Sequence, residues 1–215
     1  MQYHVNGFNP GDPDVRPAIA DHRRATDPLP QTVDVLIAGS GPAGLCLAAQ
    51  LARVPQIRTM LVEPKLGPME KGQADGISVR TMEMFQAFGF AEKVMREAVW
   101  INETTFWAPG ADAPESSQDR SQDNSPPSAG GGGHLPPPGG TLTRVARVQD
   151  VPDGTSEMPH VLINQARVHD MFLDIMRNAP TRLVPDYGLK VADLRIDPGA
   201  KDYPVSVTLE HTAPG

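Results

Sequence analysis

A glycine-rich hexapeptide gives the chain its clearest chemical signal. It follows the pattern GxGxxG, in which three glycines let a backbone turn hold the pyrophosphate of a dinucleotide. The first permits a tight turn, the second lets the phosphates approach the backbone, and the third lets a helix pack closely on a strand. The N-terminus of that helix offers N–H groups and a partial positive charge. Six residues are therefore predicted to bind the cofactor: Gly39, Ser40, Gly41, Pro42, Ala43 and Gly44.

A carboxylate at Glu63 strengthens this prediction. It ends the next apolar run, about 20 residues after the glycines, where an acidic side chain accepts hydrogen bonds from the ribose of an adenosine. The alternative is a solvated strand end with no ligand. The pattern predicts a dinucleotide site but does not distinguish FAD from NAD, because both carry an adenosine diphosphate.

The elements around the glycines have the order strand, helix, strand. Residues 33–38 (VDVLIA) form a nearly continuous apolar run, which is typical of a strand covered on both faces. Residues 43–53 have high helix propensity, and Pro55 ends that helix. Residues 59–62 form a second short apolar run. The sequence therefore predicts an α/β fold that opens with a Rossmann-like βαβ unit.

Periodicity predicts the remaining elements. Residues 165–179 form the clearest helix, with apolar side chains at helical spacing before Pro180. Residues 189–196 and 204–210 flank a turn signal at 197–199, which predicts a β-hairpin with one buried face. The other predicted elements are helices at 78–88 and 90–98 and strands at 100–107, 142–148, 160–164 and 183–184.

Composition argues against several kinds of partner. The net charge of −7 argues against a nucleic-acid surface, and no apolar run approaches the ~20 residues of a membrane helix. A single cysteine, Cys46, excludes an internal disulfide and suits the cytoplasm, and the histidines lack metal-ligand spacing. Residues 1–32 are polar and unlike a targeting peptide, so an extended arm is predicted. Residues 109–140, rich in Pro, Gly and Ser, are predicted to be a disordered insertion.

Two further segments resemble those of a known enzyme family. They are EPKLGPMEKGQADGISVRTMEMFQAFGF, which starts at Glu63, and HVLINQARVHD, which starts at His160. Both resemble the phenol 2-monooxygenase and 3-hydroxybenzoate 4-hydroxylase group of flavoprotein aromatic hydroxylases, as do MQYHVNGFNPG and AVWINETTFW. The resemblance covers nearly the whole chain outside 109–140. It implies FAD as the cofactor, NADPH or NADH as the electron donor, O2 as the oxidant and a phenolic substrate.

The resemblance also assigns roles to polar residues. Asp75, in the QADG motif, matches a catalytic and substrate-binding acid, which takes or shares the phenol proton and so activates the ring. His160 matches a histidine that holds a substrate carboxylate in the hydroxybenzoate branch. Gln165 matches a glutamine that touches the cofactor, and Gln73 is assigned to the same site. The alternatives are a turn residue, a structural histidine and ordinary polar residues, and the role of Arg80 stays open.

The resemblance implies a domain organisation as well. Residues 33–98 and 165–215 would form an incomplete FAD-binding domain, and residues 99–164 would start a substrate-side sheet, with Asp75 and His160 approaching one cleft. Full-length family members continue well beyond this length and are homodimers, so the chain is predicted to be truncated and inactive alone. A hydroxybenzoate is favoured over phenol. The alternatives are an NAD-binding reductase and a non-catalytic remnant of a flavoprotein.

Overall fold

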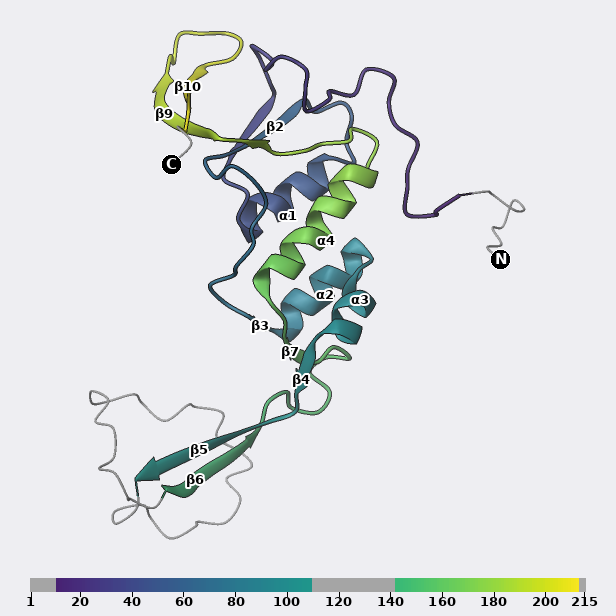
Figure 1. The fold of residues 1–215 in the computed structure, drawn as a ribbon, viewed down its shortest axis with the longest axis vertical. Helices are drawn as coiled ribbons and strands as arrows, with labels where there is room; N and C mark the ends of the chain where they lie inside the picture. The colour runs from purple at the N-terminus through teal and green to yellow at the C-terminus, as the bar shows by residue number, and fades with distance from the viewer. Residues whose placement is uncertain (1–10, 110–141, 213–215) are drawn as a thin grey trace. The chain divides into compact units, whose positions relative to one another are not determined.

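The computed structural model describes residues 11–109 and 142–212, which belong to two compact units (Figure 1). The first unit contains residues up to Asp75 and from Asn164 onward, and the second runs from Gly76 to Ile163. The predicted insertion at 109–140 lies, except for Pro109, outside the described residues.

A parallel sheet forms the first unit's central layer. Its order is β1 (Val35–Ala38), β2 (Thr59–Glu63) and β8 (Asp186–Tyr187). β1 pairs with β2 along its whole length, and helix α1 (Pro42–Leu51) connects these two strands. The predicted mixed α/β fold is confirmed, and it opens with a strand, a helix and a parallel strand.

Helix α4 (Gln165–Asn178) packs against α1 in the same unit (Figure 1). The side chain of Asn164 caps α4 by accepting a hydrogen bond from the N–H of Ala166 at 2.8 Å. The buried side chains recur every three or four residues, so they lie on one face of the helix. They are Val168, His169, Met171, Phe172, Leu173 and Met176. The helix predicted from the apolar spacing is confirmed.

The predicted hairpin consists of β9 (Leu189–Ile196) and β10 (Val205–His211). Its predicted buried face is only partial. Leu209 packs against buried side chains of β2 and β9, whereas Val205 is 47% exposed. Val207 and Leu209 are half-buried, so the alternation of the sequence gives a face that is covered only in part.

An antiparallel sheet lies in the second unit. Its order is β3 (Gly76–Ile77), β7 (His160–Leu162) and β4 (Val99–Ile101). Gly76 pairs with Leu162, and Ile101 pairs with His160. Three segments that are far apart in the sequence therefore meet on β7, and one of them begins directly after Asp75.

Helices α2 (Val79–Phe88) and α3 (Ala91–Glu97) belong to the second unit. They contact each other, and the rings of Phe85 and Phe90 lie with their centroids 4.6 Å apart. Gly89, at a φ of +92°, ends α2 as its C-cap residue. Both helices were predicted, although they were predicted as part of the FAD-binding domain at 33–98. That functional division of the chain stays a prediction.

The strand character predicted at 100–107 is confirmed, but the segment is divided between two strands instead of forming one. β4 ends at Ile101, and β5 (Glu103–Pro109) pairs with β6 (Leu142–Gln149) in a separate two-stranded ribbon. The chain therefore changes its strand partner at Asn102. Apolar and β-branched residues lie on both sides of this point, and their pattern reveals strand character but not which strand is the partner.

The short strand predicted at 183–184 is misplaced. Leu183 is buried, but the strand lies at β8, where Asp186 pairs with Val62 and Tyr187 with Glu63. The apolar residues at 183–184 indicate a buried segment, whereas the strand is defined by hydrogen bonds to β2. Those bonds form only where the chain runs alongside the end of β2.

The described part of the arm, residues 11–32, contacts the first unit. Its backbone bonds the end of α4, because the N–H of Arg16 donates to the carbonyl of Asn178 at 2.9 Å. Arg23 donates two hydrogen bonds to the carboxylate of Asp186, at 2.7 and 2.8 Å. The arm is therefore held at both α4 and β8.

Candidate cofactor site

The glycine hexapeptide forms the turn between β1 and α1. Gly39 has a φ of +100°, which residues with side chains rarely adopt, and its N–H donates to the carbonyl of Val62 at 2.8 Å. Gly44 closes on the same turn, since a Cβ atom there would lie 2.1 Å from the carbonyl oxygen of Gly39. The fold itself therefore requires the first and third glycines.

Gly41 is different, because its neighbours leave its α-carbon open. A Cβ atom there would meet no described atom within 4 Å. Gly41 is the N-cap of α1, and no side chain from the described part of the chain caps this end; the first turn also holds no acidic residue. The first N–H groups of a helix lack partners within the helix, so this end can hold an anion. A pyrophosphate suits the open side of Gly41.

Glu63 fixes the conformation of the glycine turn. It is 8% exposed, and its Oε2 accepts hydrogen bonds from the N–H of Ser40 at 2.7 Å and from its hydroxyl at 2.9 Å. Its Oε1 accepts a hydrogen bond from the N–H of Lys65 at 3.0 Å. Burial by itself raises the pKa of Glu63, but the hydrogen bonds from Ser40 and Lys65 outweigh it, so the pKa lies below the ordinary value. Glu63 is thus a buried carboxylate at the end of β2.

The structure brings the two predicted glutamines together. The side-chain oxygen of Gln165 accepts a hydrogen bond from the N–H of Gln73 at 2.8 Å, across 92 positions of the chain. Gly72 makes this approach possible, because a Cβ atom there would lie 2.4 Å from the Cβ of Gln165. Sequence reasoning missed Gly72, since nothing in its local sequence indicates a close approach to α4.

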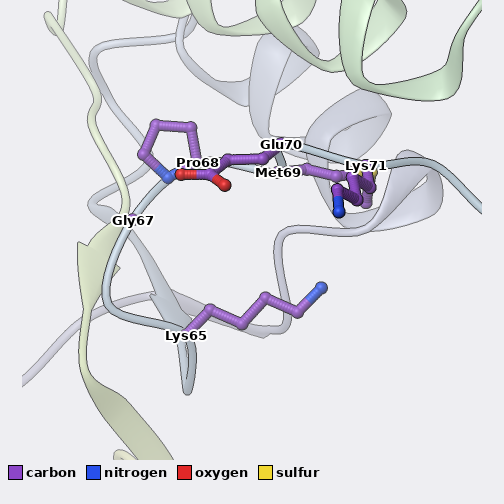
Figure 2. A pocket seen from close by; sticks show the side chains of 6 residues that line it. All are labelled: Lys65, Gly67, Pro68, Met69, Glu70 and Lys71. Carbon is purple, nitrogen blue, oxygen red and sulfur yellow. The ribbon is translucent and has the colours of Figure 1, made fainter. Parts of the chain in front are cut away.

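A pocket of about 620 Å³ lies in the loop between Glu63 and Gln73. Figure 2 shows the residues that line it, which come from this one loop: Lys65, Gly67, Pro68, Met69, Glu70 and Lys71. The two lysines put positive charge beside a segment that links two predicted cofactor-binding residues. Glu70 offsets one of these charges, so the lining keeps a net positive charge, which favours a phosphate-bearing ligand.

Asp75 is exposed and is the last residue of the first unit. His160, with which it was predicted to share a cleft, belongs to the second unit. The catalytic role of Asp75 and a cleft shared by Asp75 and His160 stay predictions.

His160 forms a close pair with Asp150. The Nδ1 of His160 lies 2.8 Å from the Oδ2 of Asp150, and the two side chains are 30% and 17% exposed. The other ring nitrogen, Nε2, lies beside Gly76, where a Cβ atom would be 3.6 Å from it. Sequence reasoning missed Asp150, because a carboxylate ten positions before a histidine, with a loop between them, has no recognisable spacing.

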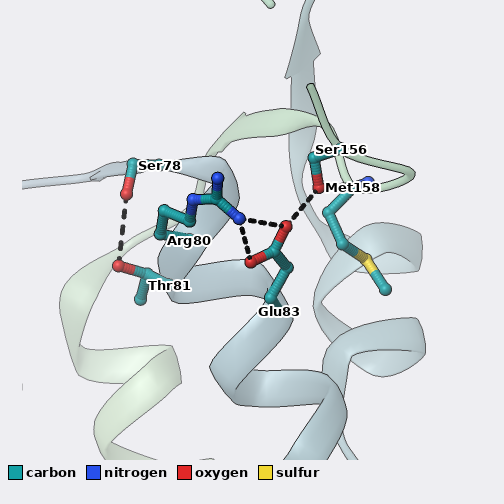
Figure 3. Close-up of polar contacts among 6 residues, drawn as sticks. All are labelled: Ser78, Arg80, Thr81, Glu83, Ser156 and Met158. Carbon is teal, nitrogen blue, oxygen red and sulfur yellow. Dashed lines mark hydrogen bonds and ion pairs between the residues drawn. The ribbon is translucent and has the colours of Figure 1, made fainter. Parts of the chain in front are cut away.

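Arg80, whose role the sequence left open, binds Glu83 on the same helix (Figure 3). Its guanidinium donates to both carboxylate oxygens of Glu83, at 2.9 and 3.1 Å. The hydroxyl of Ser156 donates to Glu83 at 2.7 Å. The hydrogen bond from Ser156 is the main cause that lowers the pKa of Glu83, followed by the one from Arg80. Arg80 thus holds a carboxylate that anchors the loop before β7.

Two predicted absences concern metal ions and membranes. Within residues 11–109 and 142–212, no group of three or more histidine, cysteine or carboxylate side chains could hold a metal ion. The same ranges contain no helix that is both long and apolar enough to cross a membrane.

Comparison with known families decides which dinucleotide the glycine turn takes. The family described as FAD binding domain matches residues 32–184, which include the turn, Glu63 and both glutamines. The chain belongs to this family. FAD is therefore the cofactor of this domain, and the open Gly41, the uncapped end of α1 and the buried Glu63 fit its adenosine diphosphate.

Relatives of this FAD binding domain are oxygenases. The chain is 52% identical over 210 residues to 3-hydroxybenzoate 4-monooxygenase of Comamonas testosteroni, covering 98% of this chain and 29% of that protein. It is 36% identical over 183 residues to an FAD-dependent monooxygenase, terD, of Aspergillus terreus, covering 82% and 25%. It is 38% identical over 80 residues to a phenol 2-monooxygenase, fsqG, of Aspergillus fumigatus, covering 37% and 13%. The family predicted from the QADG and NQAR segments is confirmed, and the chain spans less than a third of each relative.

Solved structures show the same fold. The p-nitrophenol 4-monooxygenase PnpA of Pseudomonas putida matches 83% of this chain and 36% of its own, with a TM-score of 0.59 and 18% identity. The flavin-dependent monooxygenase PieE, solved with FAD and substrate, matches 82% of this chain and 26% of its own, with a TM-score of 0.57 and 21% identity.

Proposed function

We propose that the chain is the FAD-binding part of an enzyme that hydroxylates a phenolic ring, using NADPH or NADH and O2, with a hydroxybenzoate favoured over phenol. The observation that carries this proposal is the 52% identity to 3-hydroxybenzoate 4-monooxygenase over 98% of the chain. The chain spans 29% of that relative, so the activity belongs to the proposal. The match to the FAD binding domain family favours this proposal over an NAD-binding reductase.

The Rossmann-like βαβ unit binds FAD through its backbone in this proposal. The pyrophosphate lies against Gly41 and the first turn of α1, because this end has free N–H groups and no competing acidic side chain among the described residues. Glu63 accepts a hydrogen bond from the ribose with a lone pair that Ser40 and Lys65 leave free. Gln73 and Gln165, already joined by a hydrogen bond, contact the same cofactor.

Asp75 prepares the substrate for the reaction in this proposal. FAD, once bound and reduced, supplies the activated oxygen. The phenol has a pKa of about 10, so at neutral pH it holds its proton and the ring is a weak nucleophile. A carboxylate at hydrogen-bond distance takes or shares that proton, which raises the electron density of the ring. Asp75 is exposed and lies directly before β3, so it is accessible to a substrate.

His160 holds the carboxylate of the substrate. An imidazole ring can donate a hydrogen bond to an anion, and a phenol without a carboxylate would not need this contact. The proposal therefore predicts that the preference for a hydroxybenzoate depends on His160, whereas activation of the ring depends on Asp75.

Flavin binding and NADPH oxidation test this function in one preparation. The purified chain, supplied with FAD, is assayed for NADPH or NADH oxidation and hydroxylated product with 3-hydroxybenzoate and with phenol. Product formation that is lost in D75N and retained in D202N, at an exposed aspartate between β9 and β10, supports the proposed activity. FAD binding without any product supports a non-catalytic flavoprotein and agrees with the prediction that the chain is inactive alone. Protection by NAD but not by FAD supports the reductase.

A further inference from the structure

We infer that Asp150 is a positioning residue that fixes the protonation pattern of the His160 ring, so that Nε2 binds a carboxylate only when the ring carries two protons. The inference rests on the proposed role of His160 in holding the substrate. It adds a residue, Asp150, and a consequence: a carboxylated substrate binds together with a proton taken from solvent.

The hydrogen-bonding capacities of the two groups determine where the ring proton lies. A carboxylate only accepts hydrogen bonds, so the Nδ1 of His160, 2.8 Å from the Oδ2 of Asp150, must carry a proton to make the contact. A neutral imidazole has a single N–H, and the bond made by one ring nitrogen decides the state of the other. With Nδ1–H given to Asp150, the Nε2 of a neutral ring is an acceptor and cannot donate to a second carboxylate.

The Nε2 atom of His160 lies beside β3, at a position where β3 carries no side chain. It lies next to Gly76 of β3, whose missing side chain would be 3.6 Å away. Because Gly76 pairs with Leu162 on β7, the backbone holds this spacing. His160 itself is paired with Ile101 of β4 on the other side of β7. His160 thus lies on the central strand of this sheet, with one ring nitrogen on Asp150 and the other beside a glycine.

The loop that carries Asp150 is anchored at several points. The N–H of Asp150 donates to the carbonyl of Asn102 at 3.0 Å. Nearer to β7, Ser156 donates to Glu83 at 2.7 Å and accepts a hydrogen bond from the N–H of Met158 at 3.0 Å (Figure 3). These contacts fix both ends of the loop between β6 and β7. They hold Asp150 in place independently of its contact with His160.

Two other carboxylates of the neighbouring elements have partners of their own. Asp153, in the same loop, accepts a hydrogen bond from the side chain of Gln149 at 2.9 Å. Glu83, on α2, binds Arg80 and Ser156. Among the ion pairs of the described residues, Asp150 is the carboxylate that faces the His160 ring. The protonation pattern of the ring is therefore assigned to Asp150.

Nitrogen-15 NMR of the histidine-labelled chain tests the assignment without any ligand. At about pH 8, the signals of His160, identified by their loss in H160Q, are expected to show the Nδ1-protonated tautomer. In D150N the amide can donate to a bare Nδ1, so the Nε2-protonated tautomer is expected to grow. D153N, which removes an exposed charge from the same loop, should leave the signals unchanged. An Nε2-protonated tautomer in the unaltered chain would overturn the inference, even if D150N failed to fold.

Calorimetry with 3-hydroxybenzoate tests the consequence. Titration of the FAD-supplied chain at about pH 8, in two buffers with different heats of ionisation, gives the protons taken up on binding. Net proton uptake is expected, with a clear decrease in D150N and none with phenol. Binding without uptake contradicts the inference. Failure to bind 3-hydroxybenzoate contradicts the proposed role of His160, while the NMR result still decides the role of Asp150.

Discussion

At the scale of single residues, the buried carboxylate of Glu63 joins the cofactor site to the stability of the fold. It accepts three hydrogen bonds, two from Ser40 and one from Lys65, and their combined effect lowers its pKa despite burial. A side chain in this position serves the turn whether or not a ribose is bound. The residue predicted from its spacing to bind the ribose therefore has a structural role that spacing alone did not reveal.

Replacing Glu63 with glutamine should destabilise the chain by about 1–3 kcal/mol at neutral pH, because a buried charge-assisted network loses its acceptor charge. The folded pKa of Glu63 lies below 4.5, so its contribution is present above that pH and is lost as pH falls through the folded value. The difference between E63Q and the unaltered chain, measured by urea unfolding, should thus shrink in acid. E70Q, at an exposed glutamate of the same loop, is the control. A constant difference at all pH values would contradict this account.

His169 is a second buried polar residue, and the proposed function does not use it. It is 3% exposed, and neither ring nitrogen has a hydrogen-bond partner among the described residues. Burial lowers its pKa below 6.5, and the nearby charges of Asp170 and Glu63 raise it by less. The unfolded chain therefore takes up a proton more readily than the folded chain does.

The contribution of neutral His169 to the free energy of unfolding should accordingly be fully present above its unfolded pKa of 6.5. It should fall as the pH drops below 6.5 toward the folded pKa. The free energy of unfolding should decrease between about pH 7.5 and about pH 5.5, and less steeply in H169L. H169L should also be more stable by about 1 kcal/mol at the higher pH, because two unpaired nitrogens are removed from the core. H211Q, at an exposed histidine, should keep the original slope. Equal slopes in H169L and the unaltered chain would refute the role of His169.

At the scale of elements, the turn between β1 and α1 contains two glycines that are needed for different reasons. Gly44 has no room for a side chain, because its Cβ would lie 2.1 Å from a backbone oxygen that cannot move away without shifting the strand. Gly41 has room in the fold and is needed, in this account, only for the ligand.

G44A should therefore destabilise the chain by about 1–3 kcal/mol through overpacking, without any need for FAD to be present. G41A should change the free energy of unfolding by less than about 1 kcal/mol, as expected for a substitution at an N-cap. Thermal unfolding of both variants in the absence of FAD makes the comparison. If G44A were as stable as G41A, the close packing of helix and strand at this turn would be wrong.

Sequence reasoning was most accurate where the pattern is local. The run at 33–38, the helix spacing of Val168 to Met176 and the order of the glycines each specify an element without reference to distant parts of the chain. It did not predict the division of 100–107 into two strands, because the change of partner at Asn102 depends on where β6 and β7 lie. Gly72 and Asp150 were missed for the same reason, since each matters through one distant residue, Gln165 or His160.

At the scale of the whole molecule, the arm before β1 is part of the packing of the first unit. Arg23 lies in this arm, and its partner Asp186 has a side chain only 8% exposed. Asp186 pairs with Val62 at the end of β2, next to Glu63. Residues 11–32 therefore stabilise the edge of the sheet that carries the predicted ribose-binding carboxylate.

Truncating Arg23 should cost more than truncating its neighbour. R23A leaves Asp186 largely buried without its cation and should lower the free energy of unfolding by about 2 kcal/mol, less than for a fully buried pair because Arg23 is partly exposed. R24A removes an exposed arginine of the same arm and should have little effect. Urea unfolding of the two variants measures the difference. Equal stabilities would show that the arm does not hold the sheet.

The central claim is that this chain binds FAD through the turn at Gly41. Titration with FAD, followed by quenching of flavin fluorescence, tests it most directly in the unaltered chain and in G41A, with unfolding curves to show that both are folded. The account predicts saturable binding by the unaltered chain and binding weaker by about tenfold or more in G41A, because the new methyl group occupies the place of the pyrophosphate. No binding by the unaltered chain, or equal binding by a folded G41A, would contradict it.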